Sequence, residues 1–346
     1  MTMTDGLRVG VDLGGTKIQT VICDDRDIVL AQSRLPTPNT GGPPDVADAI
    51  ADSVRQAAEE GGIGLADITA IGVGAPGQVD MVAGTLSQAG NLPGWQGVYS
   101  LGPELTSRLG APVKLGNDVQ VAVQAEVELG AGRDYGSLIG VFCGTGVGGG
   151  VVLDGKLWLG RGAAGEIGHT IVLADGATCP CGRQGCLEAY VGRGAMETEV
   201  RRRVAHGDKT KLLKIMKKKG KPRLASGVWA KALKKKDPMA VELIDRAVWA
   251  LGNGIASAVN LLDVEAVIIG GGLGLRLGQP FVDRIKEAMA PHLLLAMHPP
   301  AVHLAALGDL GGAMGAALLV EHLAPRAQIA TRPVHHIDRP ELAEDD

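Results

Sequence analysis

The sequence predicts an α/β protein large enough to form two domains. Short apolar segments of strand character alternate with longer segments of helical periodicity, which is the pattern of α/β folds. The chain has 346 residues, 45% of them hydrophobic, so each of two ordinary-sized domains can bury its own core. Only 3% of the residues are aromatic, so aliphatic side chains must supply most of that core.

The first third of the chain is expected to begin with three strands joined by tight turns. A helix should follow Pro43–Pro44, where apolar residues recur at helical spacing, and two strands and a second helix come next. The expected elements are, in order, 7–13, 17–23, 27–35, about 45–60, 68–77, 112–116 and 118–129. This opening is not a Rossmann start, because that fold has a helix after its first strand.

The rest of the chain is expected to hold two more strands and then mainly helices. A buried strand ending in glycines, a helix, a strand and a last helix complete the series. These elements are expected at 137–143, 147–153, about 187–262 (helical), 264–272, 279–290, 301–306 and 309–323. The polar tail from Pro325 onward contains several prolines and is expected to be mobile.

Charge is distributed unevenly. The formal net charge is −4, but the segment from Lys209 to Lys236 holds eleven lysines, one arginine and no acid, which leaves −16 on the remainder. An acidic body with one basic segment argues against a dedicated nucleic-acid-binding protein. The basic segment is most simply a solvated helical surface, and an anion-binding patch is the alternative.

No targeting or membrane segment is recognisable. The N-terminal residues lack the basic-then-apolar pattern of a secretory signal, and no stretch approaches 18 uninterrupted apolar residues. The five cysteines are an odd number, and Cys23 and Cys143 stand alone in strand-like contexts. These features predict a cytoplasmic protein with reduced thiols.

Glycine is the compositional outlier, with 52 residues gathered in short runs. Two runs, 72–77 and 144–149, match G-x-G-x-x-G, but strand-like residues follow each of them, whereas dinucleotide binding needs a helix there. Three glycine-rich turns remain, at 12–17, 143–146 and 270–273. Turns of this kind can direct several backbone N–H groups at an anion, and three of them in one chain favour a phosphate-binding protein.

The segment 179–186, CPCGRQGC, contains three of the five cysteines. Alone it is compatible with a disulfide staple, a redox motif, a metal site or a glycine turn. Three cysteines cannot all pair internally, and the C-x-x-C redox spacing is absent. With His169 the set becomes Cys₃His, which suits a closed tetrahedral zinc site.

Five motifs in order resemble the ROK family of bacterial sugar kinases, repressors and related proteins, which includes glucokinases and N-acetylmannosamine kinases. They are DLGGTK (12–17), GND (116–118), GTGVGGG (144–150), GEIGH (165–169) and CPCGRQGCLE (179–188), and the match covers roughly 7–325. The resemblance implies the two-lobed actin-like ATPase fold of the sugar kinase–Hsp70–actin superfamily, each lobe a mixed sheet with flanking helices. We expect a smaller lobe from 1–117 plus about 307–325, a larger lobe from 118–306, and a flexible tail at 326–346.

The resemblance also implies an active site. Asp118 would be the general base that accepts the proton of a sugar hydroxyl, although an aspartate before a helix could equally be an N-cap. Sugar-binding positions would be Asn117, Glu166, His169 and Glu188, with Gly77 and Asn91 as less secure matches. The family commonly continues the base motif as N-D-A-N, whereas Val119 and Gln120 follow here, which leaves the packing around the base and the sugar preference open.

ATP with Mg²⁺ and a structural Zn²⁺ are the cofactors that the resemblance implies. Asp12 would help to hold Mg²⁺, and the nucleotide would contact three groups of residues: Gly14, Gly15, Thr16 and Lys17; Gly144, Thr145 and Gly146; and Gly271 and Gly272. The zinc ligands would be His169, Cys179, Cys181 and Cys186.

The function expected from these residues is an ATP-dependent hexose kinase, with the 6-hydroxyl of glucose as the favoured acceptor. N-acetylmannosamine or another hexose is an alternative acceptor, and polyphosphate is an alternative donor at the basic segment. A non-catalytic, sugar-sensing regulator is the alternative class, disfavoured because the first strand begins at about residue 7. A homo-oligomer, dimer or tetramer, is also expected.

Overall fold

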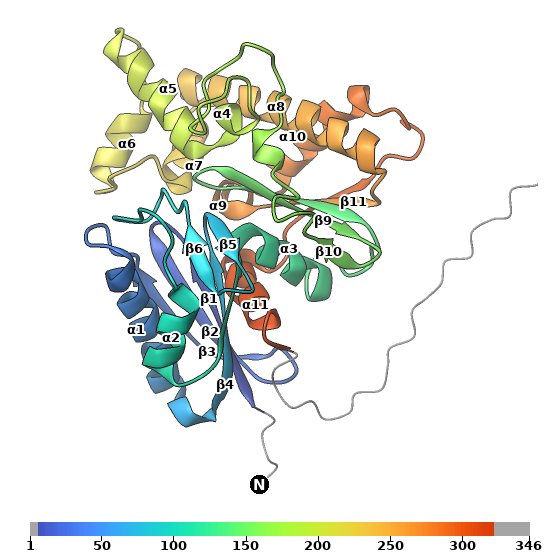
Figure 1. The fold of residues 1–346 in the computed structure, drawn as a ribbon. Coiled ribbons are helices and arrows are strands. Elements are labelled where there is room, and N and C mark those ends of the chain that lie inside the picture. Colours follow the sequence, from blue (N-terminus) through green and yellow to red (C-terminus); the bar gives the residue numbers. More distant parts are fainter. Residues whose placement is uncertain (1–5, 322–346) are drawn as a thin grey trace, which may run out of the picture.

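The computed structural model describes residues 6–321. These residues form two lobes, the lower one built mainly from the N-terminal third of the chain and the upper one mainly from the segments that follow it (Figure 1). The predicted tail at 326–346 lies outside the described residues, as do the last residues of the helix expected at 309–323. Among the described residues, no helix is both long and apolar enough to cross a membrane.

A five-stranded mixed sheet forms the lower lobe. Its strand order is β3-β2-β1-β4-β7, with β1 antiparallel to β2 and parallel to β4. The strands are β1 (Leu7–Leu13), β2 (Lys17–Cys23), β3 (Val29–Pro36), β4 (Ile68–Ala75) and β7 (Val113–Asn117). Helices α1 (Pro43–Gly61) and α2 (Leu101–Leu109) belong to this lobe, and α1 packs on β2 and β3 through its buried alanine, valine and isoleucine side chains.

The upper lobe repeats the same scheme. Its sheet has the order β10-β9-β8-β11-β12, again with one strand antiparallel and one parallel to the central strand. The strands are β8 (Leu138–Cys143), β9 (Val147–Leu153), β10 (Lys156–Trp158), β11 (Ala266–Gly270) and β12 (Ala301–Leu304). The helices are α4 (Glu188–Val191), α5 (Arg193–Ala205), α6 (Leu212–Lys218), α7 (Ser226–Lys234), α8 (Pro238–Leu262), α9 (Gly271–Leu277) and α10 (Gln279–Met289).

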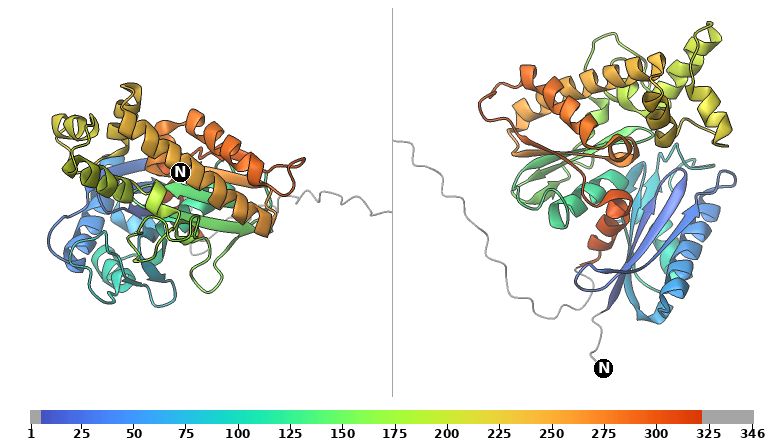
Figure 2. Two further views of the ribbon diagram at one scale, coloured as in Figure 1. Left: turned by 90° about the horizontal axis from the view of Figure 1, so that it is seen from above. Right: turned by 180° about the vertical axis from the view of Figure 1, so that it is seen from behind.

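The chain crosses between the lobes twice, and each crossing leads into a helix that covers the opposite lobe's sheet. Helix α3 (Asp118–Glu128) follows β7 of the lower lobe and packs on the upper sheet through Val123. Helix α11 (Gly311–Leu318) follows β12 of the upper lobe and packs on β1 and β4. The two helices contact each other at the centre of the molecule (Figures 1 and 2).

Glycines on the sheets make these helix contacts possible. A Cβ at Gly10 or Gly72 would overlap the backbone of α11, and a Cβ at Gly140 would overlap Val123 of α3. Gly10 and Gly72 are register partners on adjacent strands, so they form one flat site for the helix. Part of the glycine excess therefore serves helix–sheet packing rather than ligand binding.

The two-lobed fold with a mixed sheet in each lobe is confirmed. Three features were not predicted from the sequence: α2, β10 and a small hairpin formed by β5 (Gln78–Asp80) and β6 (Thr85–Ser87). The strand expected at 264–272 ends at Gly270, and Gly271 begins α9. The third glycine run is therefore a strand–helix junction and not a turn between strands.

Candidate functional site

Two acidic side chains meet at one edge of the lower sheet. Asp12 lies near the end of β1 and Asp118 directly follows β7, and both strands run parallel to β4, which lies between them. Parallel neighbours end at the same edge of a sheet, so the topology brings these carboxylates together. Gly74 of β4 lets α3 lie close to the sheet here, since a Cβ at this position would come within 2.7 Å of a Val121 methyl group.

Burial disfavours the charged form of both carboxyl groups and so raises the pKa of each. Burial, the neighbouring Asp12 carboxylate and Glu166 raise the pKa of Asp118 to about 7, against the lowering effect of the Val119 backbone N–H. Burial also raises the pKa of Asp12, with Lys17 acting in the opposite direction and Asp309 adding to the rise. A carboxylate that titrates near neutral pH is suited to proton transfer.

The helix cap is made by Asn117 and not by Asp118. The Asn117 Oδ1 accepts hydrogen bonds from the backbone N–H groups of Val119 and Gln120, each at 3.1 Å, while the Asp118 Oδ1 accepts one from Val119 at 2.9 Å. The N-cap alternative for Asp118 is therefore wrong. Asn117 retains its Nδ2 group as a donor, which is compatible with a sugar hydroxyl as its partner.

The first glycine turn closes the β1–β2 hairpin. The Gly14 N–H donates to the Lys17 carbonyl at 2.9 Å, and the Thr37 hydroxyl donates to the Gly14 carbonyl at 2.6 Å. Asn91 lies against this turn, because a Cβ at Gly15 would come within 3.1 Å of its Nδ2. One predicted sugar residue is thus adjacent to a predicted phosphate turn.

The second glycine turn joins β8 to β9 and is held from the outside by α5. The Gly144 N–H donates to the Gly146 carbonyl at 2.9 Å, and the Gly194 N–H donates to the Thr145 carbonyl at 2.9 Å. The Arg193 side chain donates to the Gly144 carbonyl and to the Thr145 hydroxyl. Arg193 was not among the residues predicted from the sequence, because it lies outside the glycine motif that it contacts.

Glu188 connects the second turn to the cysteine cluster. Its Oε2 accepts a hydrogen bond from the Val147 N–H at 2.7 Å, and its Oε1 lies 3.9 Å from the Cys179 sulfur. A Cβ at Gly146 would overlap the same carboxylate. The end of the cysteine loop and the start of β9 are therefore joined by one side chain.

His169, Cys179, Cys181 and Cys186 converge on one point. Their candidate ligand atoms all lie within 4.8 Å of one another, and the Cys181 and Cys186 sulfurs are 3.8 Å apart. Thiolates at about 2.3 Å from a tetrahedral zinc would be separated by about 3.8 Å. The His169 Nδ1 lies 3.8 Å from the Cys179 sulfur, which leaves Nε2 as the ring nitrogen directed elsewhere. The four residues can hold a metal ion in the geometry that zinc prefers.

The two residues that differ from the N-D-A-N pattern both contact the upper lobe. The Gln120 Nε2 donates to the Ala164 carbonyl at 3.3 Å, two residues before Glu166. Val119 lies against β9, where a Cβ at Gly148 would overlap its methyl groups. Gln120 therefore connects the helix that carries Asp118 to the loop that carries Glu166, and Val119 connects it to β9.

The remaining predicted residues lie at the edges of this constellation. Gly271 has a positive φ of 76° and packs on the backbone of Cys143, next to the second turn, so the start of α9 joins the phosphate-turn region. Gly77, with φ of 92°, packs against the backbone of Ser87 and Ala89 at the β5–β6 hairpin. Its predicted contact with the sugar stays a prediction.

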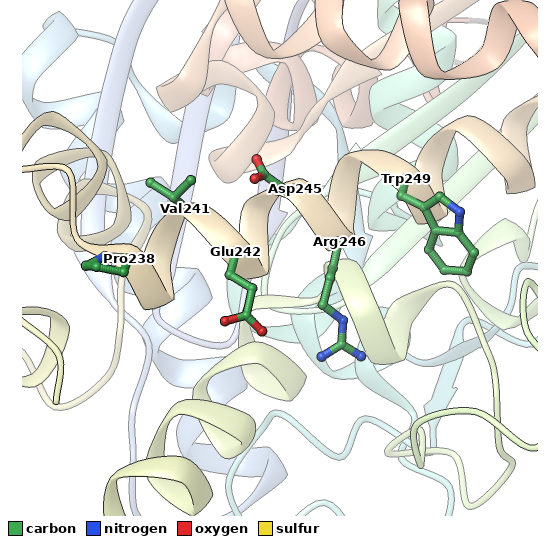
Figure 3. Close-up of a pocket in the computed structure, with 6 residues that line it drawn as sticks. All are labelled: Pro238, Val241, Glu242, Asp245, Arg246 and Trp249. Atoms are coloured by element: carbon green, nitrogen blue, oxygen red, sulfur yellow. The ribbon is translucent and has the colours of Figure 1, made fainter. Parts of the chain in front are cut away.

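The surface has two hollows that bear on the position of the site, and one of them contains predicted site residues. One, of about 450 Å³, is lined by Thr145, Gly146 and Glu188 together with Pro180 and the α5 residues Gly194, Ala195, Glu197, Thr198 and Arg201, and by Arg223. The other, of about 590 Å³, follows the exposed side of α8 from Pro238 to Trp249 (Figure 3) and contains no predicted site residue. Because the first hollow contains the predicted site residues Thr145, Gly146 and Glu188, it is the better candidate for a ligand site.

Comparisons with known proteins identify the family of this chain. The ROK family model matches residues 8–323. The chain belongs to the ROK family. Membership was predicted from the five motifs and is confirmed.

Three relatives illustrate the range within this family. A glucokinase from Streptomyces coelicolor is 33% identical over 329 residues, covering 92% of this chain and 99% of the relative. A ROK glucokinase from Streptomyces griseus, solved in complex with glucose and AMPPNP, has a TM-score of 0.75 at 32% identity, covering 91% and 99%. An N-acetylgalactosamine kinase from Shewanella sp. strain ANA-3 is 31% identical, covering 90% and 95%.

Proposed function

We propose that this ROK protein is an ATP-dependent hexose kinase in which Asp118 is the general base, with the 6-hydroxyl of glucose as the acceptor. A sugar kinase is the class of enzyme found among its glucokinase relatives. The observation that carries the role of Asp118 is its pKa of about 7, raised by burial and by the neighbouring Asp12 and Glu166. At that pKa a carboxylate can accept a proton at neutral pH, which an ordinary aspartate does poorly.

The sugar would lie between Asp118 and the wall formed by Glu166, His169 and Glu188, with the Asn117 amide as a further donor. A hexose offers hydroxyls that both donate and accept, so carboxylates, an amide and an imidazole suit it. In this arrangement the residues hold the acceptor hydroxyl beside Asp118, and the remaining work is positioning and charge stabilisation.

The nucleotide would place its phosphates on the turns at Gly14–Lys17 and Gly144–Gly146 and its adenosine near Gly271 and Gly272. Asp12 fits a Mg²⁺ ion, because a partly buried carboxylate beside a phosphate turn is the kind of oxygen ligand that Mg²⁺ takes. Bound Mg²⁺ would neutralise phosphate charge.

Zinc is the metal that best fits the Cys₃His cluster, because three thiolates and an imidazole are its preferred structural ligands. We propose that the bound ion fixes the loop carrying Glu188 and orients His169, so that it supports one wall of the sugar site without entering the reaction.

The alternatives concern the sugar and the donor. The glucokinase relatives favour glucose as the substrate, whereas the N-acetylgalactosamine kinase relative supports an N-acetylhexosamine as the alternative. Polyphosphate as donor at the basic segment 209–236 and a homo-oligomeric state remain predictions. A sugar-sensing regulator without catalysis is disfavoured by the raised pKa of Asp118.

The test is a coupled assay of ADP release with a panel of hexoses and ATP, repeated with polyphosphate and detection of the sugar phosphate. Replacing Asp118 by Asn should lower kcat by about 10²- to 10⁴-fold, because the base is lost while the side-chain volume is kept. Sugar affinity, measured by calorimetry, should change little.

The exposed aspartate Asp134 provides the matched control, and Asp134→Asn should leave kcat unchanged. Turnover in Asp118→Asn close to that of the unmodified protein would exclude Asp118 as the base. Absence of phosphate transfer to every sugar with both donors would refute the kinase itself.

A further inference from the structure

The glycine turn at 144–146 is contacted by a basic residue, Arg193, that lies outside every motif found in the sequence. Arg193 is the first residue of α5 and is half-buried. Its Nε donates to the Gly144 carbonyl at 3.0 Å and its Nη2 to the Thr145 hydroxyl at 3.3 Å. Its own backbone N–H donates to the Gly144 carbonyl as well, at 3.3 Å. Two successive residues of the turn are thus fixed by one arginine.

The other arginines of α5 are neutralised by acids. Arg201 pairs with Glu197, Arg202 with Glu199, and Arg203 with two acids. Arg193 forms no ion pair with any residue in 6–321. Burial lowers its pKa, with Glu197 opposing the change at a distance, but a guanidinium remains charged in proteins.

A charge in this position is suited to pairing with an anion. A half-buried cation is costly unless it is paired, and both of its hydrogen-bonded partners here are neutral groups of the turn. An arginine is suited to this task because its planar fork can hold backbone geometry and keep its positive charge at the same time. The turn that it holds is one of the two proposed to cradle the nucleotide phosphates.

We infer that Arg193 is a positioning residue for phosphoryl transfer, which holds the Gly144–Thr145 turn in its phosphate-binding conformation and supplies the positive charge for the triphosphate of ATP. The inference rests on the proposed function of that turn. Under this inference α5 supports the nucleotide half of the site, whereas α3 and the cysteine loop support the sugar half.

The experiment compares Arg193→Ala, Arg193→Lys and a control, Arg202→Ala. The control removes an arginine from the same helix that is 59% exposed and paired with Glu199. Binding of AMPPNP with Mg²⁺ and binding of glucose are each measured by calorimetry, and KM for ATP and kcat are measured with the best sugar of the panel.

Arg193→Ala should weaken AMPPNP binding and raise KM for ATP by about tenfold or more, because a charged hydrogen-bonding group is lost from the phosphate site. Glucose affinity should stay within about twofold, and Arg202→Ala should match the unmodified protein in every measurement. Arg193→Lys should retain charge but only part of the turn contacts, giving an intermediate KM for ATP. Guanidinium ion added to Arg193→Ala should restore part of the lost rate.

Unchanged AMPPNP affinity in Arg193→Ala would overturn the inference, and so would equal losses of AMPPNP and glucose affinity, which would indicate a merely structural role. If the alanine variant does not fold, Arg193→Gln decides in the same way, because it keeps one donor for the Gly144 carbonyl without the charge. AMPPNP binding needs no turnover, so a protein that binds AMPPNP through Arg193 but phosphorylates no sugar would refute the proposed reaction and leave this inference standing.

Discussion

At the scale of single residues, the site depends on how burial changes ordinary side chains. Asp118 is one of many aspartates in the sequence, and its helix-start position also fits a cap. What distinguishes it is its burial, together with the parallel strands that bring Asp12 beside it, and these raise its pKa to about 7. Its neighbour Asn117 takes over the capping and leaves the Asp118 carboxylate available for proton transfer.

This pKa makes the rate dependent on pH. The base acts only when deprotonated, so kcat/KM should be nearly constant above about pH 8, half-maximal near about pH 7, and should fall by about tenfold per pH unit well below that. An unperturbed aspartate would place that fall near pH 4 instead. Initial rates between pH 5 and 9 at low sugar and saturating ATP measure the midpoint.

Sugar binding measured over the same pH range provides the control, because a loss of affinity would imitate a loss of the base. A midpoint of the kinetic profile below pH 5, with sugar affinity unchanged, would contradict the raised pKa of Asp118.

At the scale of elements, glycines on the strands allow α11 and α3 to lie close to the sheets. Gly10 and Gly72 lie opposite each other on β1 and β4, and the backbone of α11 occupies the space where their side chains would be. Gly315 does the same between the two helices, where a Cβ would overlap the Val121 carbonyl. These glycines fix the distance between the lobes' connecting helices, and hence the position of Asp118 at the start of α3.

Gly72→Ala tests this packing. The new Cβ would overlap the Ala316 carbonyl oxygen, a backbone atom that cannot rotate away, so α11 must shift. We expect a loss of about 3 kcal/mol or more in the free energy of unfolding, at the upper end for overpacked cores, because the overlap is with backbone. Urea denaturation monitored by circular dichroism measures the loss.

Gly62→Ala is the comparison. Gly62 ends α1 with φ of 64° and has open space around the position of a Cβ, so its substitution strains the backbone without an overlap and should cost about 1 kcal/mol. An equal effect of the two substitutions would contradict the packing explanation for Gly72.

At the scale of the whole molecule, the site is shared between two lobes that are joined by two crossings. Glu126 of α3 is buried and accepts hydrogen bonds from the N–H groups of Ala131, Ala306 and Leu307, each at 2.9 Å. Ala306 and Leu307 lie in the return crossing between β12 and α11, so this carboxylate ties the outgoing helix to the returning chain. The cysteine loop, which leads to Glu188, is the second support that we propose for the site.

Metal removal tests that support. Cys181→Ser should lose bound zinc and weaken sugar affinity by about tenfold or more, because the loop that carries Glu188 loses its anchor. AMPPNP affinity should fall much less, because the turn at 144–146 is also held by α5. Zinc content by atomic absorption and the two affinities by calorimetry measure the outcome.

Cys23→Ala serves as the control, since Cys23 is buried in the lower lobe away from the cluster and should leave zinc content unchanged. A zinc-free Cys181→Ser protein that binds sugar normally would refute the supporting role of the metal.

The sequence alone determined the parts of this protein that depend on local spacing. Short apolar segments joined by tight turns predicted the hairpin strands, and the motifs from Asp12 to Glu188 predicted the ROK family. The CPCGRQGC segment with His169 predicted four candidate metal ligands, whose ligand atoms the structure brings within 4.8 Å of one another. These features are readable because each is encoded by residues close together in the chain or by short motifs in a fixed order.

Only the tertiary structure decided which residues act on one another across the chain. Arg193 lies 49 positions from the Gly144 carbonyl that it binds, and Asp12 and Asp118 meet only because β1, β4 and β7 end at the same edge of a sheet. The third glycine run is the start of a helix in the structure, where Gly271 packs on the backbone of Cys143. Spacing along a chain does not encode such contacts, because strand order and the paths of the two crossings determine which distant residues become neighbours.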